Sequence, residues 1–177
     1  MPSPTDRFSA RRIALLALVT AMALCVSWLE NLLPAPVPVI PVRLGLANVF
    51  TLLLLLTDDR KGAAVTTVLR ALLMVPVTGN VSRLAYGLAG GVLSLAGMLA
   101  LDVPRRRGSV GVLGLSIAGA FLYNMGQLAA GVCFAGTAVL AYIPWMGLLS
   151  LPCGALTGLI AQVTVRRIPS ALFRSGH

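Results

Sequence analysis

Residues 84–107 read LAYGLAGGVLSLAGMLALDVPRRR, an apolar run that ends at one aspartate and three consecutive arginines. The run from Leu84 to Leu101 holds no charged residue, and its length lies within the roughly 17–25 residues that a helix needs to cross a membrane. A basic cluster directly after such a run is typical of the cytoplasmic end of a transmembrane helix. The stretch therefore predicts a membrane-spanning helix.

The same alternation of apolar runs and short basic clusters extends over the whole chain. It predicts spans at about residues 13–33, 43–57, 62–77, 84–101, 110–135 and 143–165. Hydrophobic residues make up 58% of the chain and charged residues 11%, whereas about a quarter of the residues of a soluble domain are charged. We therefore expect an all-α integral membrane protein with six transmembrane helices, in which residues 1–177 form a single membrane domain.

Lysines and arginines are distributed unevenly between the two sides that six spans define. The side of the termini holds eleven of them: Arg7, Arg11, Arg12, Arg60, Lys61, Arg105, Arg106, Arg107, Arg166, Arg167 and Arg174. The opposite side holds Arg43 and Arg83, and Arg70 lies within a span. Because loops rich in lysine and arginine stay in the cytoplasm, both termini are predicted to be cytoplasmic, in a multi-pass protein of the cell membrane. The net charge of +9 follows from this topology and does not indicate nucleic acid binding, since the cations flank spans and form no common face.

A set of polar side chains lies inside the predicted spans or at their outer ends. An ionisable group within a span costs roughly 2.5–3.5 kcal/mol, so such a residue usually faces the interior of a bundle or a cavity. At 1.5 Å per helical residue, most of the set lies toward the extracytoplasmic half, with Arg70 near the middle. The set is Glu30, Arg43, Asn48, Arg70, Asn80, Arg83, Tyr123, Asn124 and Gln127.

Two interpretations of this set are open. The side chains can line a small-molecule site that opens outward, in which the planar guanidinium of arginine suits a carboxylate or phosphate group. Alternatively, Glu30 pairs with an arginine and the amides brace neighbouring helices. For the set as a whole we favour the site.

Motifs of catalysis or metal binding are missing from the sequence. It contains no GxSxG, HExxH or Walker A pattern and no DDxxD-type diphosphate–magnesium motif. With five acidic residues and one histidine, His177, the chain offers few ligands for a metal ion. We therefore predict a protein that is not an enzyme and that has no cofactor.

Two further features concern the first span and the loop after it. Four prolines between Pro34 and Pro41 predict an extended, stiff loop, because proline removes an amide donor and restricts the residue before it. Small residues recur along the first span, at Ala14, Ala17 and Ala21. Small side chains let helices approach closely, so this stripe can face a partner protein or a neighbouring helix.

Several segments together resemble a known family. They are Ser27-Trp28-Leu29-Glu30, Arg43-Leu44-Gly45-Leu46-Ala47-Asn48, Leu69-Arg70, the segment Leu84-Ala85-Tyr86-Gly87-Leu88-Ala89-Gly90-Gly91, and Asn124-Met125-Gly126-Gln127. Over roughly residues 11–165 the chain resembles the family labelled heptaprenyl diphosphate synthase component I, also called the Gx transporter family. That family often has lysine at the position of Arg43 and histidine at that of Tyr123, and both differences can alter ligand preference.

The resemblance implies a fold and a function, because the family looks related to the S components of energy-coupling factor (ECF) transporters. These are six-helix subunits of importers that bind a vitamin or similar compound near the outer face. By this resemblance the chain is an S-component-like bundle that binds a small vitamin- or cofactor-precursor-like molecule. The proline-rich loop would be its lid, and Ala14, Ala17 and Ala21 would contact a transmembrane coupling subunit, with ATPases as separate subunits. The family label also leaves open an alternative: a membrane accessory component of heptaprenyl or polyprenyl diphosphate synthesis, in isoprenoid or quinone biosynthesis.

Overall fold

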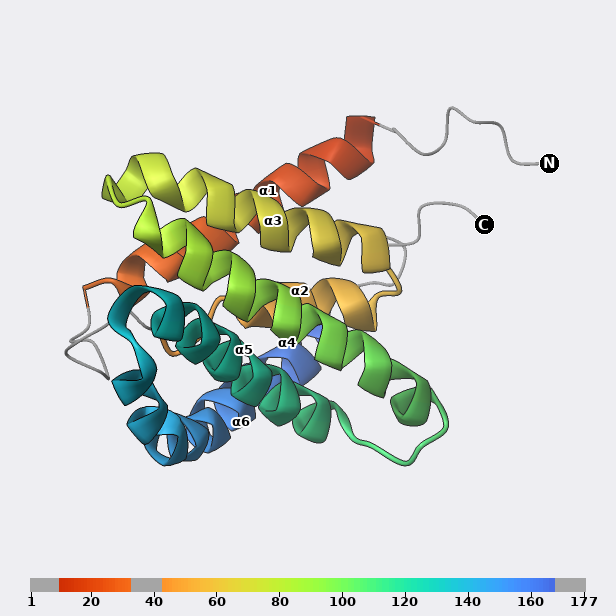
Figure 1. Ribbon diagram of the computed structural model, residues 1–177. Helices are drawn as coiled ribbons and strands as arrows, with labels where there is room; N and C mark the ends of the chain where they lie inside the picture. Colours follow the sequence, from red (N-terminus) through yellow and green to blue (C-terminus); the bar gives the residue numbers. More distant parts are fainter. Residues whose placement is uncertain (1–9, 33–42, 168–177) are drawn as a thin grey trace.

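The computed structural model describes residues 10–32 and 43–167, and every regular element within these ranges is helical. The elements are α1 (Ala10–Glu30), α2 (Asn48–Leu56), α3 (Arg60–Thr78), α4 (Ser82–Arg106), α5 (Val112–Ala135), the 3-10 helix η2 (Thr137–Tyr142) and α6 (Ile143–Arg167). They pack into one bundle in which α4 and α5 lie side by side in opposite directions and α6 crosses α5 (Figure 1). The prediction of an all-α fold is confirmed.

Five helices are long and apolar enough to cross a membrane: α1, α3, α4, α5 and α6, the last together with η2. Their outer faces carry large apolar side chains, and Leu18, Leu148 and Val163 are each more than half exposed. Contiguous apolar surface of this extent is rare on soluble monomers and is the normal surface of a helix in lipid. The chain is therefore a membrane protein.

The second predicted span, 43–57, is helical only over Asn48–Leu56, and the expectation of a spanning helix there is wrong for its first residues. Nine helical residues extend ~14 Å, less than half of the ~30 Å hydrocarbon core. The chain before α2 is not helical, and Gly45 has a φ of +81°, outside the right-handed helical region. Whether six segments span the membrane stays a prediction.

Helix α2 lies in the centre of the bundle, in contact with α1, α3, α4, α5 and α6. Of its residues only Leu53 and Leu56 are not buried. A helix that is surrounded on all sides must be apolar on all sides, which explains the sequence NVFTLLLLL. The largest core cluster forms around it, with Leu52 and Leu55 against Met98 of α4 and Leu115 of α5.

The helix boundaries at the basic clusters follow from local interactions. As predicted, Asp58–Asp59 is a boundary: Asp59 caps α3, its carboxylate accepting from the Gly62 N–H at 2.8 Å. The predicted basic loop at 102–109 is helical as far as Arg106. Asp102 accepts from the guanidinium groups three and four residues later, and cations are favourable in the last turn of a helix, so α4 extends through the cluster.

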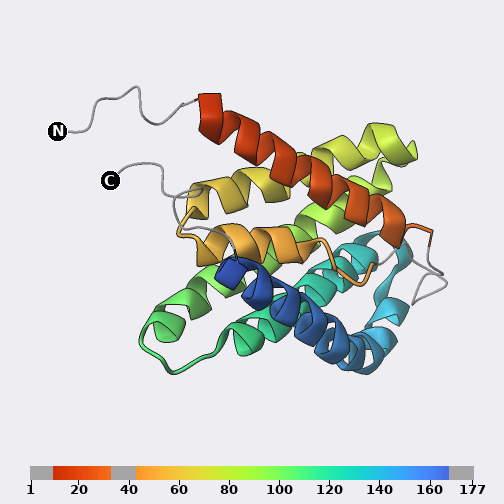
Figure 2. The same ribbon diagram turned by 180° about the vertical axis from the view of Figure 1, so that it is seen from behind.

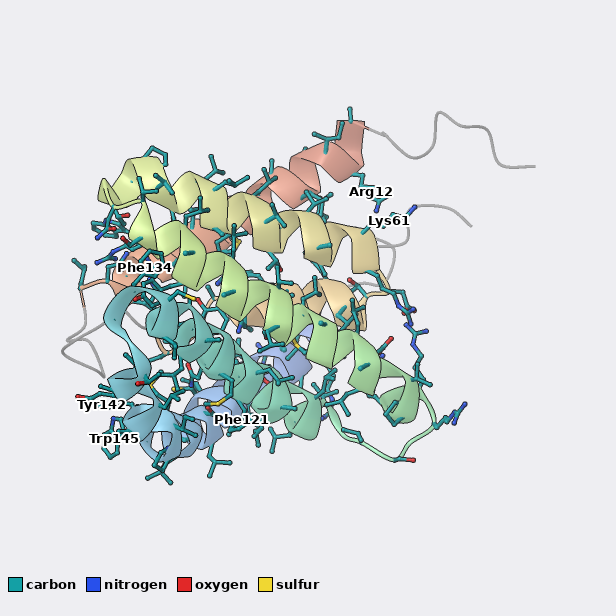
Figure 3. The ribbon with its side chains drawn as sticks, viewed as in Figure 1. Arg12, Lys61, Phe121, Phe134, Tyr142 and Trp145 are labelled. Atoms are coloured by element: carbon teal, nitrogen blue, oxygen red, sulfur yellow. The ribbon has the colours of Figure 1, made fainter. Side chains whose placement is uncertain are left out.

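The two ends of the bundle differ in composition. Figure 2 shows the start of α1 and the end of α6 at the same end, together with the α2–α3 and α4–α5 connections. We call this the basic end; it holds Arg12, Asp58–Lys61, Asp102–Arg107 and Arg166–Arg167. In Figure 3, Arg12 and Lys61 lie at this end, and Phe134, Tyr142 and Trp145 lie toward the other. We call that other end, which holds Glu30 and residues 43–48, the site end. Aromatic side chains at the end of a span are typical of a membrane–water interface.

Candidate functional site

The non-helical segment 43–47 is held by side chains from α1 and α5. Glu30, the last residue of α1, is buried, and its Oε1 accepts from the backbone N–H of Leu46 at 2.6 Å. Gln127 of α5 binds the backbone of Arg43 twice: its Oε1 accepts from the N–H at 2.8 Å and its Nε2 donates to the carbonyl at 2.9 Å. Non-helical backbone inside a membrane protein requires such partners, since lipid supplies none. These contacts replace the hydrogen bonds of a regular helix.

Arg70 of α3 lies at the centre of the site end, 96% buried. Its Nη2 donates to Asn48 Oδ1 at 3.3 Å, and its guanidinium carbon lies 5.7 Å from the ring centre of Tyr123, a cation–π distance. Asn48 in turn donates from Nδ2 to Ser94 Oγ of α4 at 3.4 Å. The ring of Tyr123 lies against Gly45, where a Cβ would approach Cδ1 to 2.8 Å. Arg70 is thus held by α2, α4 and α5 together, without a carboxylate.

Asn124 braces α5 against α6. Its Nδ2 donates to Ser150 Oγ at 2.8 Å and to the Met146 carbonyl at 3.2 Å, and its Oδ1 accepts a long hydrogen bond of 3.5 Å from Gln127. For these two amides the contacts agree with the bracing interpretation. Contact of either amide with a ligand stays a prediction.

Four buried polar atoms at the site end have no hydrogen-bond partner in the described part of the chain: Glu30 Oε2, Asn31 Nδ2, Arg43 Nη2 and Arg83 Nε. Glu30 also forms no ion pair within residues 10–32 and 43–167, although Arg43 and Arg70 are close enough for their charges to act on it. The alternative in which Glu30 simply pairs with an arginine is therefore wrong for the described residues. A buried polar group without a partner costs about 1–3 kcal/mol, and more if it is charged.

Among the predicted site residues, the structure brings most together and leaves one apart. Arg83 donates from Nη1 to Asn31 Oδ1, which joins the start of α4 to the end of α1. Asn80 is exposed, and its Oδ1 accepts from the Ser82 N–H at 3.0 Å within its own turn. Asn80 therefore does not face the cluster. The residues that meet are Glu30, Arg43, Asn48, Arg70, Tyr123, Asn124 and Gln127, with Arg83 at the edge.

The other predicted features concern α1 and the proline-rich loop. Ala14, Ala17 and Ala21 are all exposed on α1, so no other described helix covers them. Their contact with a partner stays a prediction. The loop from Pro34 to Pro41 lies outside the described residues, and its role as a lid is equally a prediction.

Sequence reasoning missed three side chains that help to build the site: Asn31, Ser94 and Ser150. Asn31 lies beside Glu30 and at the outer end of its span, and this position was a usable sign. The serines gave little sign, because a serine in a spanning helix commonly bonds a carbonyl of its own helix. Ser150 does so, donating to the Met146 carbonyl at 2.8 Å while it accepts from Asn124.

Comparison with models of protein families matches residues 19–164 to the family described as heptaprenyl diphosphate synthase component I. The matched range includes every described residue of the polar cluster. No curated protein sequence and no solved structure matches the chain.

Proposed function

The chain belongs to the heptaprenyl diphosphate synthase component I family, and from this premise we propose that it is the substrate-binding membrane subunit of an importer of the ECF type. Its substrate would be a small vitamin- or cofactor-precursor-like molecule. The residues of the site end bind this molecule and carry out no reaction on it. The relation to S components rests on the resemblance described above.

One observation carries the proposal: the buried, unmatched charge at the site end. Glu30 is 93% buried and Arg70 is 96% buried, and neither forms an ion pair among the described residues. Burial of a charge that forms no contact ion pair is unfavourable, and in membrane proteins such residues mark substrate or ion pathways. A bound molecule with matching groups would compensate these charges.

The arrangement of the chain also supports a six-segment topology with cytoplasmic termini. Residues 43–47 and α2 together run from the site end to the basic end, and α2 lies between α3 and α6. Leu46 and Ala47 form a turn, in which the Asn48 N–H donates to the Gly45 carbonyl at 2.9 Å, and the ~14 Å of α2 follow this turn. A span of which half is unwound is a known form of substrate site in transporters. The excess of lysine and arginine at the basic end supports a cytoplasmic position for that end.

An importer of this kind needs partners, which we propose to be a transmembrane coupling subunit and separate ATPase subunits. The exposed alanine stripe of α1, with Ala14, Ala17 and Ala21, would contact the coupling subunit. Bulky substitutions at Ala17 or Ala21 are expected to weaken its co-purification.

Native mass spectrometry of the purified chain tests the binding function. We expect a small molecule to co-purify with the wild-type chain, and we expect Arg70→Ala to remove it. Arg107→Ala is the matched control, because Arg107 is an exposed arginine of the basic end without an ion pair among the described residues. A wild-type chain that holds no small molecule and captures no coupling subunit would contradict the proposal.

The description of the family favours a second function, that of a membrane accessory component of heptaprenyl or polyprenyl diphosphate synthesis. This function requires that the chain, when added to a catalytic partner in vesicles, increases the synthesis of prenyl diphosphate. The importer proposal expects no change in that synthesis. The two proposals are therefore separated by one enzyme assay.

A further inference from the structure

The oxygen atoms of Glu30 have different surroundings. Oε1 accepts from the Leu46 N–H at 2.6 Å, whereas Oε2 is buried and has no partner in the described residues. Asp102, the other deeply buried carboxylate, is 0% exposed and uses both oxygens, since Oδ1 accepts twice from Arg105 and Oδ2 accepts from Arg60 and Arg106. A carboxylate that only stabilises the fold is expected to resemble Asp102. Glu30 keeps one acceptor available.

The other buried polar atoms of the site end that have no partner in the described residues are donors. They are Arg43 Nη2, Arg83 Nε and Asn31 Nδ2, all buried and without a described partner. Arg43 is close enough to Glu30, Arg70 and Arg83 for their charges to interact, so these groups form one cluster. Three arginines and one glutamate leave an excess of two positive charges. The cluster thus offers one acceptor beside several donors, with a net positive charge.

We propose that the ligand of this site is amphoteric in its hydrogen bonding. It carries an anionic group that accepts from Arg43 and an N–H or O–H group that donates to Glu30 Oε2. The inference rests on the proposed binding function and narrows its ligand class. A carboxylate or phosphate suits a guanidinium because two of its oxygens can accept two parallel N–H bonds at once. Arg70 adds positive charge from the buried side of the cluster, and Tyr123 beneath its guanidinium holds it in place.

Glu30 therefore determines specificity. A purely anionic molecule would leave Oε2 unpaired and would be repelled by the carboxylate. A purely cationic molecule would face three arginines. Sites that hydrogen-bond a polar substrate group reject analogues that lack it by large factors, because the buried partner is then left unpaired.

The first experiment analyses the compound that is released when the purified wild-type chain is denatured. Acetic anhydride adds an acetyl group to amines and hydroxyls, and trimethylsilyldiazomethane methylates carboxylates and phosphates. We expect the mass of the released compound to increase with both reagents. A compound that reacts with one reagent only overturns the amphoteric ligand while the binding function stands, whereas the absence of any compound contradicts the binding function itself.

The second experiment asks whether Glu30 recognises the donor. The released compound and its acetylated form are added back to empty wild-type chain and to Glu30→Gln, which still accepts from the Leu46 N–H but lacks the charge. Acetylation should lower affinity at least ten-fold for the wild-type chain and much less for Glu30→Gln. The bulk of the acetyl group affects both chains, so the difference between them isolates the contact with Glu30. An equal loss in both chains overturns the role of Glu30.

Thermal unfolding of the empty chains separates this role from a structural one. Glu30→Gln should unfold at close to the wild-type temperature, because the bond to Leu46 is kept and no ion pair among the described residues is lost. A structural carboxylate predicts a lower unfolding temperature. If Glu30→Gln does not fold, the anionic group of the ligand is tested in the same way. The released compound and its methylated form are added to empty wild-type chain and to Arg43→Gln. Methylation should lower the affinity for the wild-type chain much more than the affinity for Arg43→Gln.

Discussion

The carboxylates at the two ends of the bundle differ in whether they form ion pairs. At the basic end every described carboxylate is in an ion pair: Asp58 with Arg106, Asp59 with Arg12, and Asp102 with Arg60, Arg105 and Arg106. At the site end Glu30 is buried near Arg43 and Arg70 and pairs with neither. Each described carboxylate of the basic end thus has a cationic partner, whereas the site end has buried polar atoms without a partner in the described residues.

This difference separates stability from function within one small bundle. The ion pairs of the basic end join α1 and α4 to the turn between α2 and α3, and α3 to α4, so they fix helices against each other. Among the described residues the site end has no ion pair, and hydrogen bonds hold its helices together, such as those of Asn124 with Ser150 and of Gln127 with the Arg43 backbone. Its charges therefore remain available to a molecule that enters, and natural proteins commonly give up stability at such sites.

Substitution at Asp102 should have the largest effect, and it should act on stability. Asp102→Asn replaces a fully buried acceptor of three arginines by an amide whose NH₂ faces another donor. Removing one partner of a buried ion pair costs about 3–5 kcal/mol. We expect a loss of this order in the free energy of unfolding, measured by denaturant titration in detergent micelles. Ligand retention per folded molecule should remain unchanged.

Asp58→Asn is the matched control. The Asp58 side chain is 63% exposed, and exposed ion pairs contribute about 0.2–1 kcal/mol. Asn also tolerates the positive φ of this position, +66°, so the backbone is not disturbed. If Asp102→Asn and Asp58→Asn lower the free energy of unfolding equally, burial does not determine how much an ion pair of the basic end contributes to stability.

Gln127 should have the next largest effect, and here stability and binding should change together. Gln127→Ala leaves the N–H and carbonyl of Arg43 without partners, at about 1–3 kcal/mol for each group. It also frees the segment that positions the Arg43 guanidinium, so ligand retention in native mass spectra should fall. Gln162→Ala, a half-buried glutamine of α6 with no hydrogen bond among the described residues, should change neither quantity. If Gln127→Ala leaves ligand retention unchanged, the two hydrogen bonds from Gln127 to the Arg43 backbone are not needed to position Arg43 for the ligand.

The parts of the fold that the sequence could predict are those set by local pattern. Long apolar runs between basic clusters were sufficient for α1, α3, α4, α5 and α6, and the charged cluster after residue 57 was sufficient for the boundary before α3. The unwound segment 43–47 could not be predicted from pattern. Its course depends on Glu30 and Gln127, which are 16 and 84 residues away from their backbone partners in the sequence.

The candidate site shows the same limit. The positions of polar residues along the helices were sufficient to group Glu30, Arg70 and Tyr123, because a polar side chain within a span usually faces the interior of the bundle. Distance along a helix does not give the direction of a turn, and this is why Asn80 was included although its side chain is exposed. Ser94 and Ser150 were missed because their partners lie on other helices.

Substitution of one glycine at each end compares the two ends at positions with nearly the same φ angle. Gly45 has φ +81° and Gly108, at the basic end, has φ +80°, so alanine at either position costs about 1–2 kcal/mol of backbone strain. A Cβ at Gly45 would also lie 2.8 Å from the Tyr123 ring, whereas one at Gly108 would meet nothing within 4 Å. We expect Gly45→Ala to lower thermal stability further than Gly108→Ala and to reduce ligand retention, which Gly108→Ala should leave intact. Equal effects would show that the packing of Tyr123 against Gly45 is not needed to hold Arg70.

The smallest effect is expected at Asn80, and it sets the boundary of the site. Asn80→Ala removes an exposed side chain that accepts one hydrogen bond within its own turn, so stability should change by about 0.5 kcal/mol or less. Asn48→Ala removes a buried amide that accepts from Arg70 and donates to Ser94, so it should lower both stability and ligand retention. The two variants are made in the same chain and compared by native mass spectrometry. A loss of ligand at Asn80→Ala as large as that at Asn48→Ala would place the turn before α4 in the site after all, and the cluster would then extend beyond the groups that now meet around Arg70.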